Sequence, residues 1–468
     1  MNASAQPTRS WLHISVLITL LISLFLVSAH AIQSPGKARQ LRRSGLVLNS
    51  VIESPVSGPV TAPPPPSSGF APQTRLGFTS GDQWEPAIAA DRFGHIYVLY
   101  PQYLGVPGCS DCYSPTMILQ ISNDGGAAWN TPTIIYPGGR TTGQWDAQIV
   151  VDPVDGRTVY ASWLQNGKSD TVVAKSIDFG ATWSVVTADS TNAGTDKPIL
   201  VVRGQDVYVA FNHAQKEWVA ASHDGGATFT AANVNAPSKL GWSLSGGGAI
   251  DLAGNVYFSW AGYKQNGGAK GPVYLYVSKS SDGGRTWTTT QIDVSGAPPD
   301  CSAYSCGWAY LGAQMVMTAD SSGTLYVLWN ANASDKAPNR VYFAKSTNGG
   351  ATWTTKVDVS TAPSGTHHNF PAIAAGAAGD VRISWMDNRG GLWNTYYRSS
   401  TDGGAAWSSE VDLSTYVSGY SYIQTQGFNF PFGDYYEMDI DAQGYTHAIW
   451  GEALNYDTPG SIWYTKGK

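Results

Sequence analysis

Charged residues are scarce in this sequence: Asp, Glu, Lys and Arg make up 13% of its 468 residues, whereas hydrophobic residues make up 42%. A chain with this much apolar content can bury a large core, which excludes a disordered protein. Positive charge is scarcer still, because the formal net charge is −6. The first 72 residues hold five basic residues and one acidic residue, so the remainder carries ten more acidic than basic residues. An acidic body argues against DNA or RNA as the main partner.

Long hydrophobic runs are absent after Val27. The one such run, Trp11 to Val27, follows Arg9 and ends in Ala29-His30-Ala31, the pattern of a secretory signal peptide over residues 1–31. An uncleaved membrane anchor is the alternative, although the run is close to the short limit for a span. We therefore expect a secreted, periplasmic or extracellular protein with no membrane span after cleavage.

Residues 32–72 combine a basic patch with the run Pro63-Pro64-Pro65-Pro66. Such a run favours extended polyproline II, and we expect a Pro-rich flexible tether here. Beyond it, glycine (52), tyrosine (25) and tryptophan (18) are abundant. Many turns combined with many aromatic residues favour an all-β fold.

One motif, Ser-X-Asp-X-Gly-X-Thr-Trp with small variations, recurs six times. Its copies begin at Ser122, Ser176, Ser222, Ser280, Ser346 and Ser400, in steps of 54, 46, 58, 66 and 54 residues. Repeats of this period predict propeller blades or another array.

A second pattern gives the number of blades. Short strands that end in an aromatic residue recur seven times, and their last residues are Tyr100, Trp163, Phe211, Trp260, Trp329, Trp385 and Trp450. Six turn motifs alone would give six blades, but seven such strands predict a seven-bladed β-propeller with strands A to D from the centre outward. The last blade lacks a D strand, and a closed ring leaves no exposed edge. We expect Thr74–Thr79 to supply that strand and join the two termini.

The repeated turn is similar to the Asp box of sialidases and related propellers. The resemblance covers the body from about Gln73, so we expect one propeller over residues 73–468. It implies structural turns on the face away from the active site, rather than six metal or sugar sites. The turns also resemble no complete calcium loop.

The resemblance implies that the mouth of the central channel is the functional face. Each A strand begins there, and the seven entrances hold Trp84-Glu85, Trp145-Asp146, Asp196-Lys197, Leu244-Ser245, Ala313-Gln314, Asn369-Phe370 and Asp434-Tyr435. Paired carboxylates perform glycoside chemistry, and aromatic faces stack on sugars. Glu85, Asp146 and Asp434 are the candidate acid, base or nucleophile. Trp84, Trp145 and Trp242 are the candidate stacking platforms. Polar entrances are also common simply because a channel is wet.

Two positions allow a direct comparison with sialidases. That family carries Arg-X-Pro at the first A strand, where Pro86 matches the proline but Trp84 replaces the arginine. Only Arg140, Arg340 and Arg389 are expected in loops on the functional face, so a clamp for a sialic acid carboxylate is not predicted. Tyr435 falls at the register of the family's nucleophilic tyrosine, which makes it a further nucleophile candidate. A structural tyrosine is the alternative.

The four cysteines form two close pairs, Cys109 with Cys112 and Cys301 with Cys306. In an exported protein these predict two local disulfides rather than one zinc site. The adjacent His367 and His368 give no metal signature, because neighbouring strand residues point to opposite faces. We expect neither a metal nor a cofactor.

Three functions remain open. The first is a monomeric, glycan-active glycoside hydrolase of the sialidase-like superfamily that is not tuned to sialic acid. The second is a non-catalytic module that binds a glycan or a protein on the same face. The third is a polysaccharide lyase, with His368 and Tyr435 as base and acid and Lys197 neutralising a uronic acid.

Overall fold

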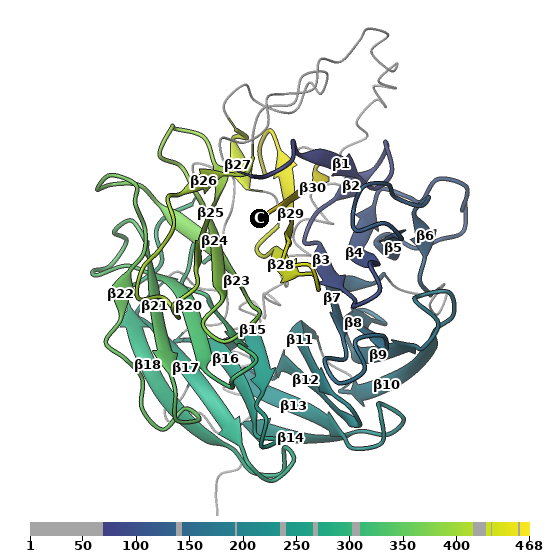
Figure 1. Cartoon of the computed structure of the whole chain (residues 1–468), viewed down its shortest axis with the longest axis horizontal. Coiled ribbons are helices and arrows are strands. Elements are labelled where there is room, and N and C mark those ends of the chain that lie inside the picture. Colours follow the sequence, from purple (N-terminus) through teal and green to yellow (C-terminus); the bar gives the residue numbers. More distant parts are fainter. Residues whose placement is uncertain are drawn as a thin grey trace, which may run out of the picture.

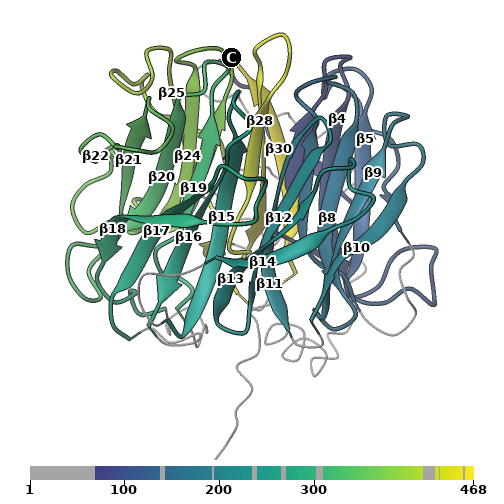
Figure 2. The same ribbon diagram turned by 90° about the horizontal axis from the view of Figure 1, so that it is seen from below.

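The structure is a computed structural model that describes residues 69–136, 143–191, 194–234, 240–264, 270–301, 309–414, 427–431, 433–456 and 459–468. Seven small antiparallel sheets surround one axis, which confirms an all-β, seven-bladed propeller (Figure 1). Seen from the side, the strands run between the two faces of the ring (Figure 2). Among the described residues, no helix has the length and apolar character needed to cross a membrane.

The blades follow one another along the chain, and each contributes an inner strand to the wall of the channel. Blade 1 contains β2 (Asp82–Gln83), β3 (Ala87–Ala90), β4 (Ile96–Tyr103), β5 (Thr116–Ser122) and β6 (Thr133–Ile134). Blade 2 contains β7 (Trp145–Val151), β8 (Val159–Gln165), β9 (Asp170–Ser176) and β10 (Ser184–Ser190). Blade 3 contains β11 (Thr195–Arg203), β12 (Asp206–His213), β13 (Lys216–Ser222) and β14 (Thr230–Val234).

The remaining blades repeat this order. Blade 4 contains β15 (Trp242–Ile250), β16 (Val256–Tyr263), β17 (Val273–Ser280) and β18 (Thr288–Ser295). Blade 5 contains β19 (Met315–Ala319), β20 (Leu325–Ala331), β21 (Arg340–Ser346) and β22 (Val357–Asp358). Blade 6 contains β23 (His368–Ala375), β24 (Val381–Asp387), β25 (Asn394–Ser400) and β26 (Val411–Asp412). Blade 7 contains β27 (Phe430–Pro431), β28 (Glu437–Ile440), β29 (Thr446–Ala453), β30 (Ser461–Gly467) and β1 (Thr74–Leu76).

The hydrophobic core consists of separate apolar layers between neighbouring blades rather than of one central cluster. Trp163, Trp260, Trp329, Trp385 and Trp450, which stand near the ends of the second strands, are fully buried. Each apolar cluster joins neighbouring sheets, as blades 4 and 5 share one cluster and blades 5 and 6 share another. An inner strand is therefore apolar on the faces that meet its neighbours, as sheet-on-sheet packing requires.

The six repeated turns share one hydrogen-bond pattern, shown here for blade 4. Ser280 Oγ donates to Asp282 Oδ1 over 2.8 Å and accepts the Gly284 N–H at 2.9 Å, while Asp282 Oδ1 accepts the Thr286 N–H at 2.9 Å. Gly283 and Gly284 have φ values of 74° and 82°, a region that favours glycine. These local bonds account for the turn without any ligand.

Lysines connect several of these turns to the preceding blade. Lys175, Lys279 and Lys345 each stand directly before the motif serine. Their ammonium groups donate to the carbonyl oxygens of Gly225, Gly349 and Gly403 in the next blade, over 3.1, 3.0 and 2.7 Å. Lys466 makes the same bond from blade 7 to Gly125 of blade 1, over 2.8 Å, across the junction of the chain ends.

The ring closes where sequence reasoning placed the closure. Strand β1 pairs antiparallel with β30, with Thr74 opposite Tyr464 and Leu76 opposite Ile462. The packed body also includes Phe70, which is 3% exposed, and Ala71, whose N–H donates to Lys466 O over 2.8 Å. Both residues had been assigned to the tether, because a single Phe among polar residues gives no strand pattern.

The closing segment meets a buried carboxyl group that makes stability depend on pH. Glu452 accepts a hydrogen bond from Trp450 Nε1 at 2.9 Å and from Gln73 Nε2 at 3.3 Å. Burial raises the pKa of Glu452 from its ordinary value of 4.5 to about 8. The unfolded chain releases this proton near pH 4.5, whereas the folded protein holds it to about pH 8. The folded state thus binds more protons in this window.

The free energy of unfolding should therefore fall as pH rises from about 5 to about 8. Glu452→Gln keeps both acceptor contacts but cannot ionise, so its slope against pH should be shallower than that of the wild type. Urea unfolding at a series of pH values measures both slopes. Equal slopes would show that Glu452 does not hold its proton in the folded protein.

Three consecutive glycines let the inner strands of blades 4 and 5 approach each other. A Cβ atom at Gly246 would lie 2.0 Å from the backbone oxygen of Met315, so Gly246→Ala must displace backbone. We expect a loss of about 1–3 kcal/mol in unfolding free energy, the usual cost of overpacking. A Cβ atom added at Gly390 would have no other atom within 4 Å, so Gly390→Ala is the matched control. Equal melting temperatures for the two variants would contradict the close approach.

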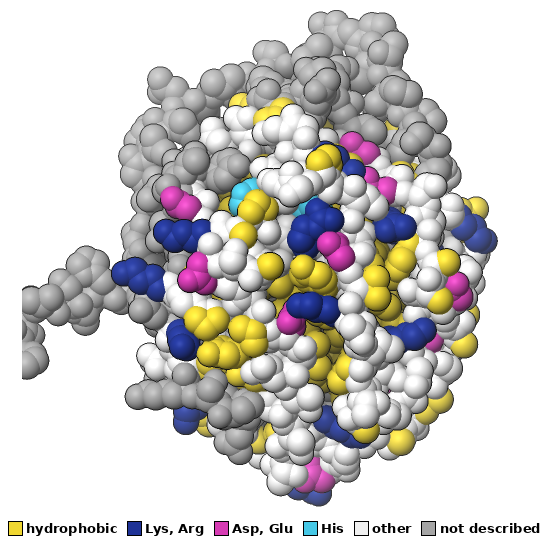
Figure 3. All heavy atoms as spheres, turned by 90° about the vertical axis from the view of Figure 1, so that its left-hand side faces the viewer, with side chains coloured by type: hydrophobic (Ala, Val, Ile, Leu, Met, Phe, Trp, Pro, Cys, Tyr) yellow, Lys and Arg dark blue, Asp and Glu magenta, His cyan; other side chains and the backbone are white. Residues whose placement is uncertain are grey.

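On the side formed by β18 and β22, the outer wall of the ring carries both positive and negative side chains. Figure 3 shows basic, acidic and apolar side chains interspersed on this side. Val294 and Val357 are among its exposed apolar residues.

Candidate functional site

Four entrances share an unusual backbone feature. Glu85, Asp146, Lys197 and Phe370 have φ values of 54°, 58°, 52° and 53°, in the left-handed region that non-glycine residues seldom adopt. The inner strands of blades 2, 3 and 6 contain one extra residue at this point, as in a β-bulge. Bulges of this kind reorient side chains and are common beside functional sites. Glu85, Asp146 and Lys197 therefore occupy the same structural position in three successive blades, 1, 2 and 3.

Seven residues at this level form the group that we call the entrance cluster: Glu85, Asp146, Lys168, Asp196, Lys197, Asp434 and Tyr435. Lys168 comes from the hairpin between β8 and β9. Its ammonium lies 2.9 Å from Asp146 Oδ2 and 2.8 Å from Asp196 Oδ1. Burial and the Coulomb interaction with Lys168 act in opposite directions on Asp196, and its pKa rises to about 6.

The second half of the cluster is centred on Lys197. Its ammonium forms an ion pair with Asp434 and lies 3.7 Å from the centre of the Tyr435 ring. Burial alone would raise the pKa of Asp434, but the Lys197 ammonium and a hydrogen bond with Glu85 together lower it. Burial and then the Asp434 charge raise the pKa of Glu85 well above its ordinary range. Glu85 is thus the protonated member of a carboxyl pair, and Asp434 is the ionised member.

Tyr435 is held in its neutral form. Burial is the main cause that raises the pKa of its phenol well above the ordinary value, and Glu85 and Asp146 raise it further because both are ionised at the high pH where a phenol titrates. The hydroxyl donates to Ala147 O over 3.4 Å. A phenol in this state donates a hydrogen bond but is a weak general acid, because a catalytic proton donor works best when its pKa lies near the working pH.

A cavity of about 310 Å³ follows the channel axis beneath the entrance cluster. This volume is near the lower end of the range for small-molecule sites, roughly 300–1,000 Å³. Among the described residues, its polar lining includes Asp146, Gln148, Lys197, Ser245, Gln314, Tyr435, Glu437 and Asp439. Glu85 and Asp434 are not part of that lining, so they act on the cavity through Lys197 and Tyr435.

Glu437 and Asp439 connect blade 7 to blade 1 along the cavity wall. Glu437 accepts the Ile88 N–H at 3.1 Å and a bond from Gln148 Nε2 at 2.6 Å, while Asp439 accepts the Ala90 N–H at 2.8 Å. Burial raises the pKa of Glu437 to about 8 and that of Asp439 to about 6. Glu437 is therefore largely protonated at neutral pH.

The structure brings together five of the nine residues that the sequence singled out for catalysis or substrate binding: Glu85, Asp146, Lys197, Asp434 and Tyr435. The three tryptophans do not belong to the described cavity lining, although the Trp145 ring centre lies 6.0 Å from Lys168 Nζ. Trp84 stacks on Tyr103 with ring centres 4.5 Å apart and shares a packed cluster with Trp145, and Trp242 contacts Tyr263. Trp84 is 1% exposed, Trp145 4% and Trp242 8%, so these rings serve as core.

His368 also lies apart from the cluster. It is fully buried, its Nδ1 contacts Asn339 O at 2.9 Å, and its Nε2 lies 3.7 Å from Asp387. No contact joins it to Tyr435 in the described ranges, so the two are not arranged as a base and acid. Arg340 pairs with Asp358, and Arg389 pairs with Asp387 and Glu410. Arg140 lies outside the described residues.

Sequence reasoning missed Lys168 and gave Glu437, Gln148 and Gln314 no role. Lys168 follows Asn166-Gly167, a tight hairpin signal. That hairpin joins the second and third strands of blade 2, a connection that opens on the entrance face. The signal for a cation at the mouth was therefore present.

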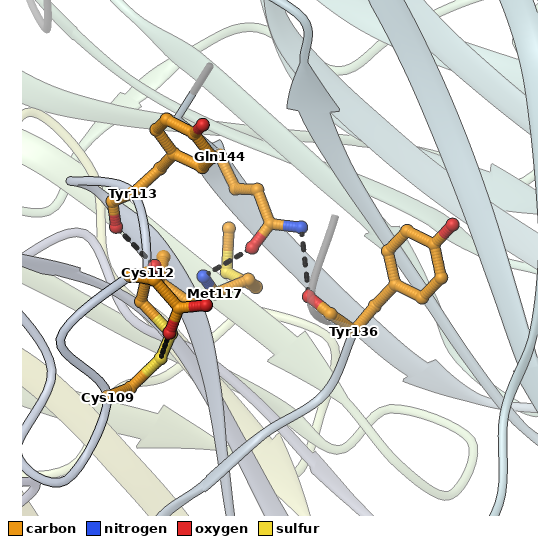
Figure 4. The surroundings of a disulfide bond; sticks show 8 residues. Cys109, Cys112, Tyr113, Met117, Tyr136 and Gln144 are labelled. Carbon is orange, nitrogen blue, oxygen red and sulfur yellow. Dashed lines mark hydrogen bonds between the residues drawn. A yellow bond between two sulfur atoms is a disulfide. The ribbon is translucent and has the colours of Figure 1, made fainter. Parts of the chain in front are cut away.

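A disulfide stiffens the loop between β4 and β5 near the same face (Figure 4). Cys109 and Cys112 are bonded, with Cα atoms 5.5 Å apart, which confirms that pair. Gln144 anchors the neighbouring strand by accepting the Met117 N–H at 2.7 Å and donating to Tyr136 O over 3.3 Å. Cys301 is also disulfide-bonded, whereas Cys306 lies outside the described residues. Within the described part of the chain, no group of three or more His, Cys, Asp or Glu side chains is arranged to hold a metal.

No family model and no curated protein matches the sequence. Solved structures do share the fold. The ulvan lyase of polysaccharide lyase family PL25 has a TM-score of 0.52 and 10% identity, over 83% of this chain and 95% of that one. Hadza microbial sialidase Hz136 has a TM-score of 0.44 and 14% identity, over 83% and 66%. YCF48 from Cyanidioschyzon merolae has a TM-score of 0.44 and 12% identity, over 84% and 98%.

The class of protein is thus a seven-bladed β-propeller whose fold is shared with the ulvan lyase. An identity of 10% supports the architecture alone, since one fold hosts many functions. The function has to be argued from the cavity and the entrance cluster.

Proposed function

We propose that this protein is a secreted glycan-active enzyme, a glycoside hydrolase of the sialidase-like superfamily that does not require sialic acid. The observation that supports it is a set of buried titratable groups with displaced pKa values, gathered at one cavity of ligand size. Such groups are concentrated at catalytic sites.

The roles follow from which groups reach the cavity. Asp146 lines it and is paired with Lys168, which suits a base or nucleophile. Glu437 lines it and holds its proton at neutral pH, which suits a proton donor, whereas Tyr435 lines it as a neutral hydrogen-bond donor. Glu85, Asp434 and Lys197 set the charge around Tyr435. A pair of carboxyl groups in different protonation states is the usual requirement of glycoside hydrolysis.

A non-catalytic glycan-binding module is the second candidate. It is favoured by the ion pairs of the entrance cluster, because Lys168 and Lys197 are both satisfied by neighbouring carboxylates. A fully paired network can hold the blades together without performing chemistry.

The experiment that separates these candidates is a screen of purified residues 69–468 against a broad glycan panel, with product release and binding measured separately. Release of a reducing sugar from at least one glycan supports the hydrolase. Binding without release supports the module, and an unsaturated product would indicate a lyase. No binding and no release would reject a glycan function.

A further inference from the structure

One polar side chain in the cavity, that of Gln314, makes no hydrogen bond within the described part of the protein. Gln314 is only 8% exposed and lines the cavity from blade 5. Its backbone is fixed, since its N–H donates to Asn330 Oδ1 over 2.9 Å. Its side-chain amide has no hydrogen-bond partner among the described residues. The amide is therefore open to the cavity, where it can both donate to and accept from water or the polar groups of a ligand.

Asp146 offers a second free position, from blade 2. Lys168 engages its Oδ2 atom at 2.9 Å, and Oδ1 has no hydrogen-bond partner within the described ranges. The cavity thus presents an amide, which both donates and accepts, and a carboxylate oxygen, which only accepts. Sugar hydroxyls satisfy both, because each donates one hydrogen bond and accepts others.

The charges around the cavity disfavour an acidic ligand. Asp146 and Asp439 line it as acidic groups, whereas Glu437 is largely protonated at neutral pH and Lys197 is the one cation in the described lining. The Lys197 ammonium is already paired with Asp434. A carboxylate or sulfate group placed here would meet carboxylates without a free cation to receive it.

The rest of the wall is apolar. Val150, Ile199, Val316 and Ile373 line the cavity and are only partly buried, as expected where side chains border empty space. Such a surface suits the C–H face of a sugar ring, while the hydroxyl edge faces the polar groups.

We propose that the cavity selects one uncharged sugar unit, with Gln314 as a specificity-determining residue that bonds its hydroxyl groups. This inference rests on the proposed glycan function and names its substrate class. It separates the protein from propellers that hold a sugar through its acidic group, because here the recognition groups are an amide and one carboxylate oxygen.

The test uses methyl glycosides of glucose, galactose, N-acetylglucosamine, glucosamine, glucuronic acid and galacturonic acid, with binding to residues 69–468 measured by ligand-observed NMR. At least one uncharged glycoside should bind more tightly than its uronic acid counterpart, by at least about tenfold. Gln314→Leu should weaken that binding by about tenfold, the scale of one or two uncharged hydrogen bonds. Gln443→Leu, in the turn between β28 and β29 at the opposite end of the blade, is the control and should leave it unchanged.

Four results would overturn the proposal. Tighter binding of a uronic acid, or of the glucosamine cation, would overturn the uncharged class while leaving a glycan function intact. Unchanged binding in Gln314→Leu would overturn the role of that residue. Absence of saturable binding for every probe would overturn this inference, whereas the broad glycan panel separately decides the glycan function.

Discussion

Asp146→Asn should reduce turnover of the glycan identified in the panel by at least about a hundredfold, the scale of a lost base or nucleophile. Within the part of the chain that the structure describes, Asp146 is the carboxylate of the entrance cluster that both lines the cavity and has one oxygen without a hydrogen-bond partner. The amide has nearly the same size, so the fold should persist. Steady-state kinetics give the turnover, and thermal unfolding gives the stability in the same buffer.

Asp196→Asn is the matched control for this prediction. Asp196 contacts the same Lys168 ammonium, at 2.8 Å, but does not belong to the described cavity lining. Both variants weaken the ion pair, and only Asp146→Asn alters the cavity. Equal losses of turnover in the two variants would mean that the ion pair, rather than the Asp146 carboxylate, supports activity. Full activity in Asp146→Asn would show that Asp146 is neither the base nor the nucleophile. Tyr435→Phe and Glu437→Gln would then be the next variants to measure.

A chain that begins at Gly81 should lose most of its stability, because blade 7 then lacks its outer strand. Strand β1 covers the edge of β30, and Phe70 packs against Tyr397 with ring centres 4.9 Å apart. An uncovered edge leaves backbone groups of β30 without partners and opens the ring at one point. Melting temperatures of the two chains, beginning at Gly69 and at Gly81, measure the effect.

The shorter change Phe70→Ala tests the same closure in a chain that is otherwise intact. Removing a buried Phe side chain costs about 3–5 kcal/mol, and here the loss falls on the contact between the chain ends. A chain from which residues 1–68 are removed should melt like one that begins at residue 32. Closure by β1 would be wrong if the chain that begins at Gly81 melted at the same temperature as the one that begins at Gly69.

Much of the architecture could be predicted because it is encoded locally. A turn such as Ser280 to Trp287 is held by bonds between residues four positions apart or fewer, so its sequence signature is complete within one segment. The aromatic ends of the second strands are equally local, and seven copies imply seven blades. The missing outer strand followed from a general rule, since a ring without an edge needs a partner for β30.

The site was predictable only in part. The alignment of strand starts brought Glu85, Asp146, Lys197, Asp434 and Tyr435 to one level, because equivalent positions of successive blades meet at the mouth. The same alignment also selected Trp84 and Trp145, because residue type alone does not show whether an indole faces the channel or the neighbouring sheet. The bulge at Glu85 and Asp146, with φ values of 54° and 58°, reorients this stretch of the strand.

By itself, the sequence determined the fold class and the number of blades, because both depend on patterns within short segments, and it determined the closing strand because a closed ring needs a partner for its last edge. Only the tertiary structure decided which lysine meets which carboxylate and which carboxyl group keeps its proton. Lys168 and Asp146 are separated by one hairpin, but Lys197 and Asp434 are 237 positions apart. Burial and the distances between charges across blades set these states, and no pattern along the chain specifies such quantities.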